Sequence, residues 1–219
     1  MINIQLIKES IPLLAQGALV SLEIAGLGAF IGIIGGTFLA LMQTSKNSIL
    51  RWLVTLYVTI IRGTPMLIQI TFAYYVLPQF GVQLPAFWVA VVAIGLNSAA
   101  YVSQIIKAGI RSIGKGPIEA GKVLGLSHMQ ITRYIILPQA FATVLPALGN
   151  EFITLVKDSS LASTIGVVEL TKQGIFIRSR TFDALSVFAA VALMYLVITT
   201  SLSLIINWFE KRMNRHVRH

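Results

Sequence analysis

The chain alternates between long apolar runs and short polar segments. Five of the runs reach about twenty residues, the length that an α-helix needs to cross the hydrocarbon core of a bilayer. This pattern predicts an all-α fold, a multi-pass membrane helical bundle with five transmembrane helices. We expect residues 1–219 to form a single transmembrane domain. The predicted spans cover residues 17–42, 53–77, 87–106, 134–155 and 184–209.

Two segments outside these spans carry helical patterns of their own. In residues 3–14, apolar side chains recur at helical spacing around polar ones, which predicts a short helix at the membrane interface. Residues 159–183 are too polar to cross the hydrocarbon. We expect them to form short helices at the outer face.

Within the first span, small residues recur every four positions and therefore share one helix face. Small side chains on a face allow another helix to approach closely. Packing inside the subunit is the favoured interpretation, and a dimer interface is the alternative. The four residues are Gly28, Gly32, Gly36 and Ala40.

Composition supports a membrane protein. Hydrophobic residues make up 56% of the sequence and charged residues only 11%, a composition typical of multi-pass membrane proteins. The net charge of +9 comes from Lys and Arg residues that lie between and after the apolar runs and form no basic face, which argues against nucleic-acid binding. The chain has no Cys, which excludes disulfides and cysteine-ligated metals, and we expect no metal site and no cofactor.

The basic residues are distributed unevenly between the loops. Cytoplasmic segments of membrane proteins are enriched in Lys and Arg, so the distribution predicts an N-terminus outside and a C-terminus in the cytoplasm. The cytoplasmic set would be Lys46, Arg51, Lys107, Arg111, Lys115, Lys122, Arg133, Lys211, Arg212, Arg215 and Arg218, and the outer set Lys8, Lys157, Lys172, Arg178 and Arg180.

The polar segment between the third and fourth spans, residues 114–133, predicts two short helices. Pro117 opens the first, because Pro fits the first turn of a helix, and Gly125 can end it in a left-handed cap. Ser127 and Gln130 have the spacing of a capping box and start the second helix. The two helices would form a compact knob that fits a cleft of a partner protein. An ordinary loop on the membrane surface is the alternative.

Residues 119–138 also carry a longer motif: E-A-A, three residues, G, nine residues and I-x-L-P. The motif resembles the cytoplasmic coupling loop of bacterial ABC importer permeases. The resemblance implies that Glu119, Ala120, Gly121, Gly125 and Leu126 couple the chain to an ATPase. The matching residues are Glu119, Ala120, Gly125, Ile135, Leu137 and Pro138, whereas Gly121 stands where Ala is usual.

The second span carries the string RGTPMLIQ, residues 62–69, which interrupts its own helix. Pro65 lacks an N–H and clashes with the preceding turn. The break would leave backbone N–H groups near Met66 and Leu67, and such a helix start carries a partial positive charge that suits an amino-acid carboxylate. A proline kink that serves only packing is the alternative. For Arg62, pairing with a buried carboxylate or reaching the inner surface is favoured over direct substrate contact.

The fourth span presents two carboxylates and a hydroxyl on one face, because Glu151, Thr154 and Asp158 fall at i, i+3 and i+7. Counted from Pro138 at about 1.5 Å per residue, Glu151 lies about 20 Å into the membrane if Pro138 sits at the inner surface. An unpaired charge at this depth is costly, so we expect these acids to face a wet cavity or a partner. Two acids favour a substrate with cationic groups. Neutralisation by Lys157, by Arg62 or by the lipid interface is the alternative.

Residues 99–113 resemble a further pattern of these permeases, A-A-Y-x-A-E-I-x-R-G-G-I, with two departures at charged positions. Gln104 stands where Glu is usual, and Lys107 stands where Arg is usual. Because Gln104 is neutral, an ion pair at this position is not expected to be part of the mechanism.

The Arg-Gly-Thr-Pro string is similar to one found in polar amino-acid permeases of the ABC class. Together with the loop motif, it makes the chain resemble the permease (transmembrane) subunit of a bacterial polar amino-acid ABC importer, in the histidine/glutamine/arginine permease family. The resemblance implies a type I ABC importer fold in the cytoplasmic (inner) membrane. It also implies a homodimer or a heterodimer with a similar permease, a pair of ABC ATPase subunits and an extracytoplasmic substrate-binding protein. The chain would be a transport subunit and not an enzyme. An ion-coupled secondary amino-acid carrier and a purely structural membrane subunit are the alternatives.

Overall fold

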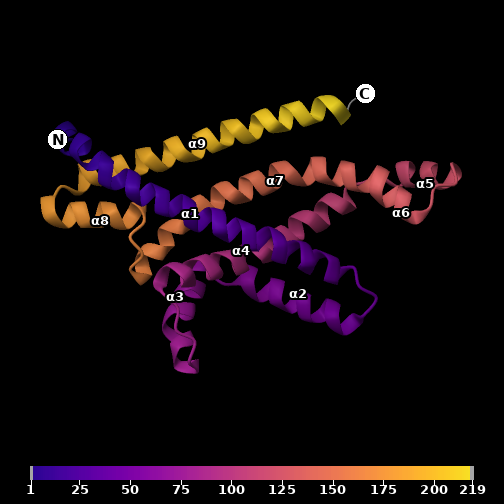
Figure 1. Ribbon diagram of the computed structural model, residues 1–219, viewed down its shortest axis with the longest axis horizontal. Helices are drawn as coiled ribbons and strands as arrows, with labels where there is room; N and C mark the ends of the chain where they lie inside the picture. Colours follow the sequence, from indigo (N-terminus) through magenta and orange to yellow (C-terminus); the bar gives the residue numbers. More distant parts are fainter. Residues whose placement is uncertain (1, 218–219) are drawn as a thin grey trace.

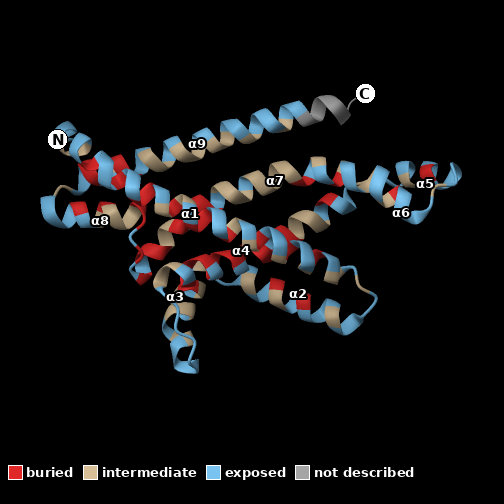
Figure 2. Cartoon of the chain, viewed as in Figure 1, coloured by how far each residue is buried: buried red, intermediate tan, exposed pale blue. Residues whose placement is uncertain are grey.

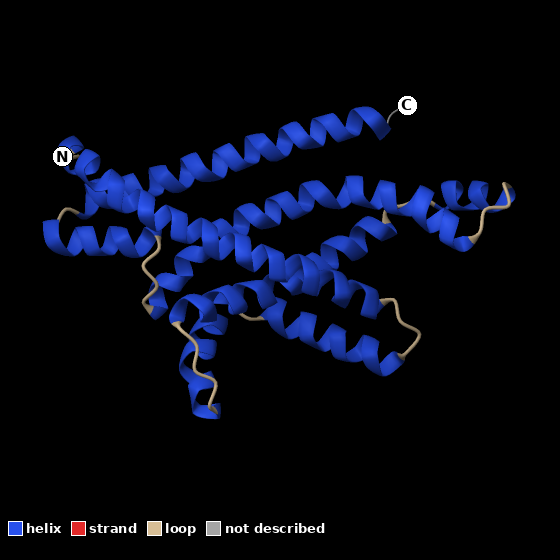
Figure 3. Ribbon diagram, in the orientation of Figure 1, coloured by secondary structure: helices blue, strands red, loops and turns tan. Residues whose placement is uncertain are grey.

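The computed structural model describes the backbone of residues 2–217 and the side chains of residues 2–212, and over this range it contains helices and no strand (Figure 3). Helices α1, α4, α7 and α9 run along the long axis of the molecule, whereas α3 projects to one side (Figure 1). The elements are α1 (Ile4–Gln43), α2 (Ser48–Gly63), α3 (Met66–Val76), η1 (Leu77–Phe80), α4 (Ala86–Arg111), α5 (Lys115–Val123), α6 (His128–Ile131), η2 (Thr132–Ile136), α7 (Leu137–Asp158), η3 (Ser159–Ile165), α8 (Leu170–Thr181) and α9 (Ala184–Val217).

Four helical segments of the described chain are long and apolar enough to cross a membrane: Ile4–Gln43, Ala86–Arg111, His128–Ile165 and Ala184–Arg212. A fifth crossing is possible as a bent pair, because α2 and residues 66–80 together pass the same test but meet at an angle of 104°. All five predicted spans are therefore helical. The second is not a straight helix, and the break lies where the sequence predicts it.

Helix α1 is longer than the sequence indicates. The prediction separates a helix at residues 3–14 from the first span, whereas α1 continues through Pro12 without interruption. A proline inside a helix removes one backbone hydrogen bond. Leu14, two residues after Pro12, is completely buried in a cluster formed with α8 and α9. Packing around Leu14 outweighs the lost hydrogen bond and keeps the helix continuous.

The small-residue face of α1 packs against α4 of the same subunit. A Cβ atom at Gly36 would lie 2.6 Å from Cβ of Val102 and 2.9 Å from the backbone oxygen of Ala99. Only glycine permits this separation of the two helices, which confirms the intrasubunit interpretation of the stripe. The facing pairs are Gly28 with Ile94, Gly32 with Ser98 and Gly36 with Val102.

A buried carboxylate links three helices at the end of the bundle that holds the N-terminus. Glu169 accepts hydrogen bonds from the backbone N–H groups of Thr171 (2.9 Å) and Lys172 (2.8 Å), and so caps α8. It also accepts from the Tyr195 hydroxyl of α9 (2.9 Å) and the Ser21 hydroxyl of α1 (3.3 Å). Burial raises the pKa of Glu169 above its usual range, although these four hydrogen bonds act in the opposite direction.

The segment of residues 159–183 contains two short helices, as predicted. They are η3, at Ser159–Ile165, and α8, at Leu170–Thr181.

Burial is concentrated where α1, α4 and η3 face one another, while the outer surfaces of α2 and α9 are exposed (Figure 2). The exposed side chains there are large and apolar, such as Trp52 on α2 and Leu204 on α9. In water such a surface would be unfavourable, but lipid tails are as apolar as these side chains. The exposed surface is that of a protein embedded in a bilayer.

Substitution of Gly36 tests the α1–α4 packing. We expect Gly36→Ala to lower the free energy of unfolding by about 1–3 kcal/mol, the usual cost of overpacking a tight interface. Gly26→Ala is the matched control, because no atom lies within 4 Å of a Cβ at Gly26 on the same helix. Its greater helix propensity should leave stability unchanged or raised by up to about 1 kcal/mol. Thermal unfolding of the purified protein in detergent measures both, and equal melting temperatures would contradict the packing argument.

Candidate functional site

The predicted knob is present at the end of the bundle opposite the N-terminus (Figure 1). Helix α5 ends in a Schellman motif, in which the N–H of Leu126 donates to the carbonyl of Gly121 at 3.0 Å and the N–H of Gly125 donates to that of Lys122 at 3.0 Å. Gly125 has a φ of +73°, which confirms the left-handed cap. Ser127 and its partner three residues later form both hydrogen bonds of the predicted capping box.

The knob has an anchored side and an exposed side. Gly121 is buried, and a Cβ at this position would lie 2.7 Å from Cδ1 of Ile135. Of the other predicted coupling residues, Glu119, Ala120 and Gly125 are exposed and Leu126 is half-buried. Exposed large apolar side chains were not part of the predicted set, although an apolar pair inside a polar loop is a visible signal. They are Val123 (87% exposed), Leu124 (78%) and Met129 (79%).

The second helix of the knob is not separate from the fourth span. Helix α6 passes through the single π-helical turn η2 into α7, so that His128–Ile165 forms one segment of 38 residues. The predicted second helix of the knob and the predicted span from residue 134 thus belong to one helical segment. The backbone N–H of Thr132 bonds back to His128 and Met129, so the helix continues from α6 into η2. The knob and α7 are therefore joined without an intervening loop. Farther along, Pro138 and Pro146 of α7 lack the N–H that would continue the hydrogen-bond ladder.

The break in the second span is a sharp turn. Helix α2 ends at Gly63, Thr64 is extended and Pro65 has the φ of −64° that its ring requires. The carbonyl of Pro65 accepts hydrogen bonds from the N–H groups of Ile68 (3.0 Å) and Gln69 (3.2 Å). Helix α3 therefore starts at Met66, as the proline predicts.

Gln69 holds the break together, and sequence reasoning did not assign it a role. Its Nε2 donates to the carbonyls of Ile61 (2.8 Å) and Thr64 (3.1 Å) and to Oγ1 of Thr64 (2.8 Å). Its Oε1 accepts from Nδ2 of Asn97 on α4 at 2.9 Å. One side chain thus satisfies carbonyls that the break exposes and ties the break to α4. A cavity of about 470 Å³ lined by α2, α3 and α4 lies beside it.

The predicted acidic face lies on α7. Oε1 of Glu151 accepts a hydrogen bond from the buried Ser98 hydroxyl of α4 at 3.0 Å. Glu151 and Asp158 are half-buried, whereas Thr154 is exposed and its hydroxyl donates to the carbonyl of Asn150. The i, i+3, i+7 spacing therefore places the three side chains on one helix as expected. The polar Ser98 inside the third span favours a helix–helix hydrogen bond, and tertiary structure makes Glu151 its partner.

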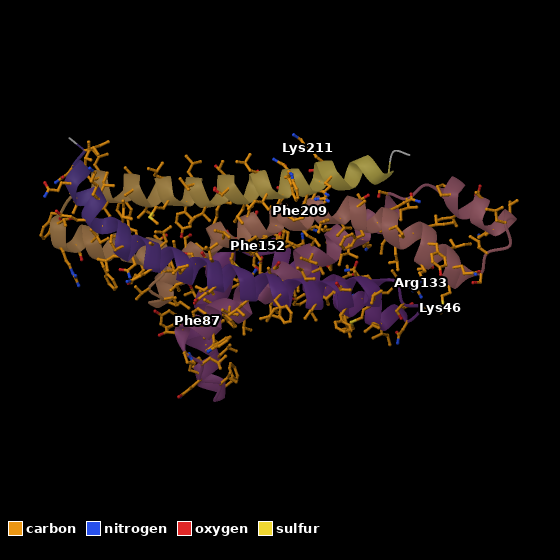
Figure 4. The ribbon with its side chains drawn as sticks, turned by 45° about the horizontal axis from the view of Figure 1, so that its top comes forward. Lys46, Phe87, Arg133, Phe152, Phe209 and Lys211 are labelled. Atoms are coloured by element: carbon orange, nitrogen blue, oxygen red, sulfur yellow. The ribbon has the colours of Figure 1, made fainter. Side chains whose placement is uncertain are left out.

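The start of α3 and the acidic helix α7 border the same apolar cluster. Met66 packs against a cluster that includes Leu155, and Phe152 of α7 packs against the same cluster. Phe152 lies near the middle of the bundle (Figure 4). Leu67 is more exposed, at 41%. Arg62 lies elsewhere, with its guanidinium 5.2 Å from the centre of the Tyr101 ring and not beside a carboxylate of α7.

Within the described residues, no group of three or more His, Cys, Asp or Glu side chains could hold a metal ion. The candidate site consists of the helix break at Pro65, the two acids of α7 and the knob.

Comparison with known proteins decides the family. Residues 6–215 match the family described as the inner membrane component of binding-protein-dependent transport systems. This chain belongs to that family. The match covers every predicted span and the knob, and it confirms the resemblance to ABC importer permeases.

Individual relatives cover almost all of this permease. The glutamine transport system permease protein GlnP of Escherichia coli is 42% identical over 94% of this chain and 95% of its own length. The L-cystine transport system permease protein TcyB of Bacillus subtilis is 40% identical over 97% of this chain and 92% of its own length. A solved structure of an amino acid ABC transporter with histidines has a TM-score of 0.92 at 38% identity, covering 97% of this chain and 99% of the other. These comparisons confirm the all-α ABC permease fold and give no support to an ion-coupled carrier.

Substitution of Gln69 tests the cap of the break. We expect Gln69→Leu to leave the carbonyls of Ile61 and Thr64 unpaired and to lower the free energy of unfolding by about 1–3 kcal/mol. Gln79→Leu is the control, because Gln79 makes one exposed hydrogen bond, to the carbonyl of Tyr75. Thermal unfolding and limited proteolysis near residues 61–69 are the measurements. Equal stability and equal cleavage of the two variants would exclude this role for Gln69.

Proposed function

We propose that this permease forms half of an ATP-driven importer that moves a polar L-amino acid into the cell. An extracytoplasmic binding protein delivers the amino acid, and two ABC ATPase subunits bind the knobs of a permease dimer, made of two identical chains or of this chain and a similar one. The names of the relatives, which concern glutamine, L-cystine and an amino acid transporter with histidines, support this substrate class.

The continuity of the knob with α7 carries the proposal. The apolar side chains of Val123, Leu124 and Met129 are exposed to solvent at the tip of the knob. Isolated exposed apolar residues are common, but three on one short loop suit insertion into a cleft of a partner protein. Because His128–Ile165 is one helical segment, a force on the tip moves the helix that bears Glu151 and Asp158.

The distribution of charge supports a cytoplasmic position for the knob. Lys46 and Arg133 lie at the end of the bundle that carries α5 and α6 (Figure 4). Basic residues are enriched in cytoplasmic segments. The N-terminus, at the opposite end in Figure 1, is then outside, where the binding protein docks.

The proposed substrate path uses the helix break and the acidic face of α7, which border the same apolar cluster. The start of α3, at Met66 and Leu67, offers backbone N–H groups and a partial positive charge for the amino-acid carboxylate. Glu151 and Asp158 offer acceptors for the ammonium group and for a basic side chain. Closure of the ATPases brings the knobs together and opens the cavity outward, and their separation opens it inward.

Gly125 tests the coupling function. Its φ of +73° strains any residue with a β-branched side chain, so Gly125→Val should distort the turn between α5 and α6. We expect ATP hydrolysis by the purified complex to continue while amino-acid uptake into proteoliposomes falls at least about tenfold, and Glu119→Ala, on the exposed face of α5, should act in the same direction. Gly116→Ala is the control, because a Cβ there meets no atom within 4 Å and its φ is not positive. Normal uptake by the Gly125 variant would disprove the coupling function.

The acids of α7 test the substrate site. Loss of a charge-assisted hydrogen bond costs about 1.5–3 kcal/mol, so Glu151→Gln and Asp158→Asn should reduce uptake of arginine relative to glutamine by about tenfold or more. Glu9→Gln is the control, since Glu9 is exposed on the first turns of α1 and contacts only Gln5 by hydrogen bond. Competition between the two radiolabelled amino acids in proteoliposomes gives the ratio. A ratio unchanged in both α7 variants would remove these acids from the site.

A further inference from the structure

A second cavity, distinct from the apolar one at the break, lies between α2 and α4. It has a volume of about 450 Å³ and is lined mainly by polar side chains. The polar residues of each helix recur at helical spacing, so each helix contributes one continuous stripe. The stripes are Thr55, Thr59 and Arg62 on α2 and Tyr101, Gln104 and Lys107 on α4, and Gln43 of α1 closes one side.

The charge of this cavity is entirely positive. Arg62 and Lys107 line it, and no carboxylate is among its described lining residues. Lys107 Nζ donates to Oε1 of Gln43 at 2.8 Å, and Nε2 of Gln104 approaches the same oxygen at 3.4 Å. A guanidinium has five N–H donors and an ammonium has three. The cavity therefore holds far more hydrogen-bond donors than acceptors.

The cavity runs from one end of the bundle to the helix break. Lys107 lies one turn before the end of α4, whereas Arg62 lies next to the break, about 21 Å along α2 from its first residue. A cation at this depth is costly unless it faces water or an opposite charge. Stacking of Arg62 on the Tyr101 ring compensates only in part. An oxyanion that enters the cavity would supply the missing acceptors.

We infer that this cavity is an anion-binding half-channel that receives the carboxylate of the transported amino acid on its way to the cytoplasm. The inference rests on the proposed function, which supplies both the amino acid and the direction. A carboxylate can accept two parallel hydrogen bonds from the Arg62 guanidinium. The ammonium group is repelled by both cations, so the amino acid enters carboxylate first. The neutrality of Gln104 matters for this property, because a carboxylate at its position would cancel one of the two positive charges of the cavity.

The chain contains no Cys, so single cysteines can report the potential of the half-channel in the permease–ATPase complex. Thr59→Cys places a thiol among the lining residues, and Thr164→Cys places one at an exposed position on η3. Each is treated with the anionic reagent sulfonatoethyl methanethiosulfonate and the cationic reagent trimethylammonioethyl methanethiosulfonate. After normalisation to a free thiol, we expect the anionic reagent to react about tenfold faster at position 59, the scale of steering by a charged cleft. The ratio at position 164 should stay near one.

Two substitutions test which side chains cause this ratio. In the Thr59→Cys background, Gln104→Glu and Lys107→Gln should each reduce it several-fold, because the first adds a negative charge and the second removes a positive one. Gln104→Asn is the conservative control and should keep the ratio. A ratio near one in the parent, or a ratio insensitive to Gln104→Glu, would overturn the inference.

Protection experiments identify the anion. L-Glutamine at millimolar concentration should slow labelling at position 59 in nanodiscs of phosphatidylcholine, and L-glutaminamide, which lacks the carboxylate, should not. Slowing that requires phosphatidylglycerol and is independent of L-glutamine would assign the site to lipid phosphate and would overturn the inference, as would an absence of protection by L-glutamine.

ATP-driven amino-acid uptake is measured on the same preparations. Uptake without the charge-dependent ratio removes only the half-channel. Ratio and protection without uptake would remove the proposed import function and leave the anion site supported.

Discussion

A helix can break inside a membrane only if the backbone groups freed at the break find partners within the protein. In this permease Pro65 forces the break, and Gln69 makes it tolerable by donating to the carbonyls of Ile61 and Thr64. The hydrogen bond from Asn97 fixes Gln69 against α4. The 104° turn, the exposed start of α3 and the cavities on both sides of the break all depend on this small network.

Outside the break, the helices are held together by close packing and by buried hydrogen bonds. The glycine face of α1 brings α4 into close contact, and Glu169 joins α1, α8 and α9 at the end opposite the knob. The knob itself continues into α7 through one π-helical turn. Such turns are often found at functional sites. In the proposed mechanism this helical connection passes motion of the knob to α7, whereas a flexible loop would absorb it.

Charges inside the bundle are separated by sign. Glu151 and Asp158 lie on α7, with Glu151 bound to Ser98, whereas Arg62 and Lys107 line the cavity between α2 and α4. A zwitterionic amino acid carries one group for each region. This separation unites the proposed substrate site with the proposed half-channel, because the first suits the ammonium and the second suits the carboxylate.

The sequence by itself determined the features that depend on local chemistry. Apolar run lengths predicted the spans, and the missing N–H of Pro65 and its clash with the preceding turn predicted the break. Gly125, Ser127 and Gln130 predicted the two caps of the knob. Tertiary structure alone decided whether α1 continues past Pro12, how sharply the second span bends, and which partners Gln69 and Glu151 find on α4. Gln69 and Asn97 are 28 positions apart in the sequence, and Ser98 and Glu151 are 53 positions apart. The continuity of α1 depends on the burial of Leu14 against distant helices. Local periodicity carries no information about such contacts.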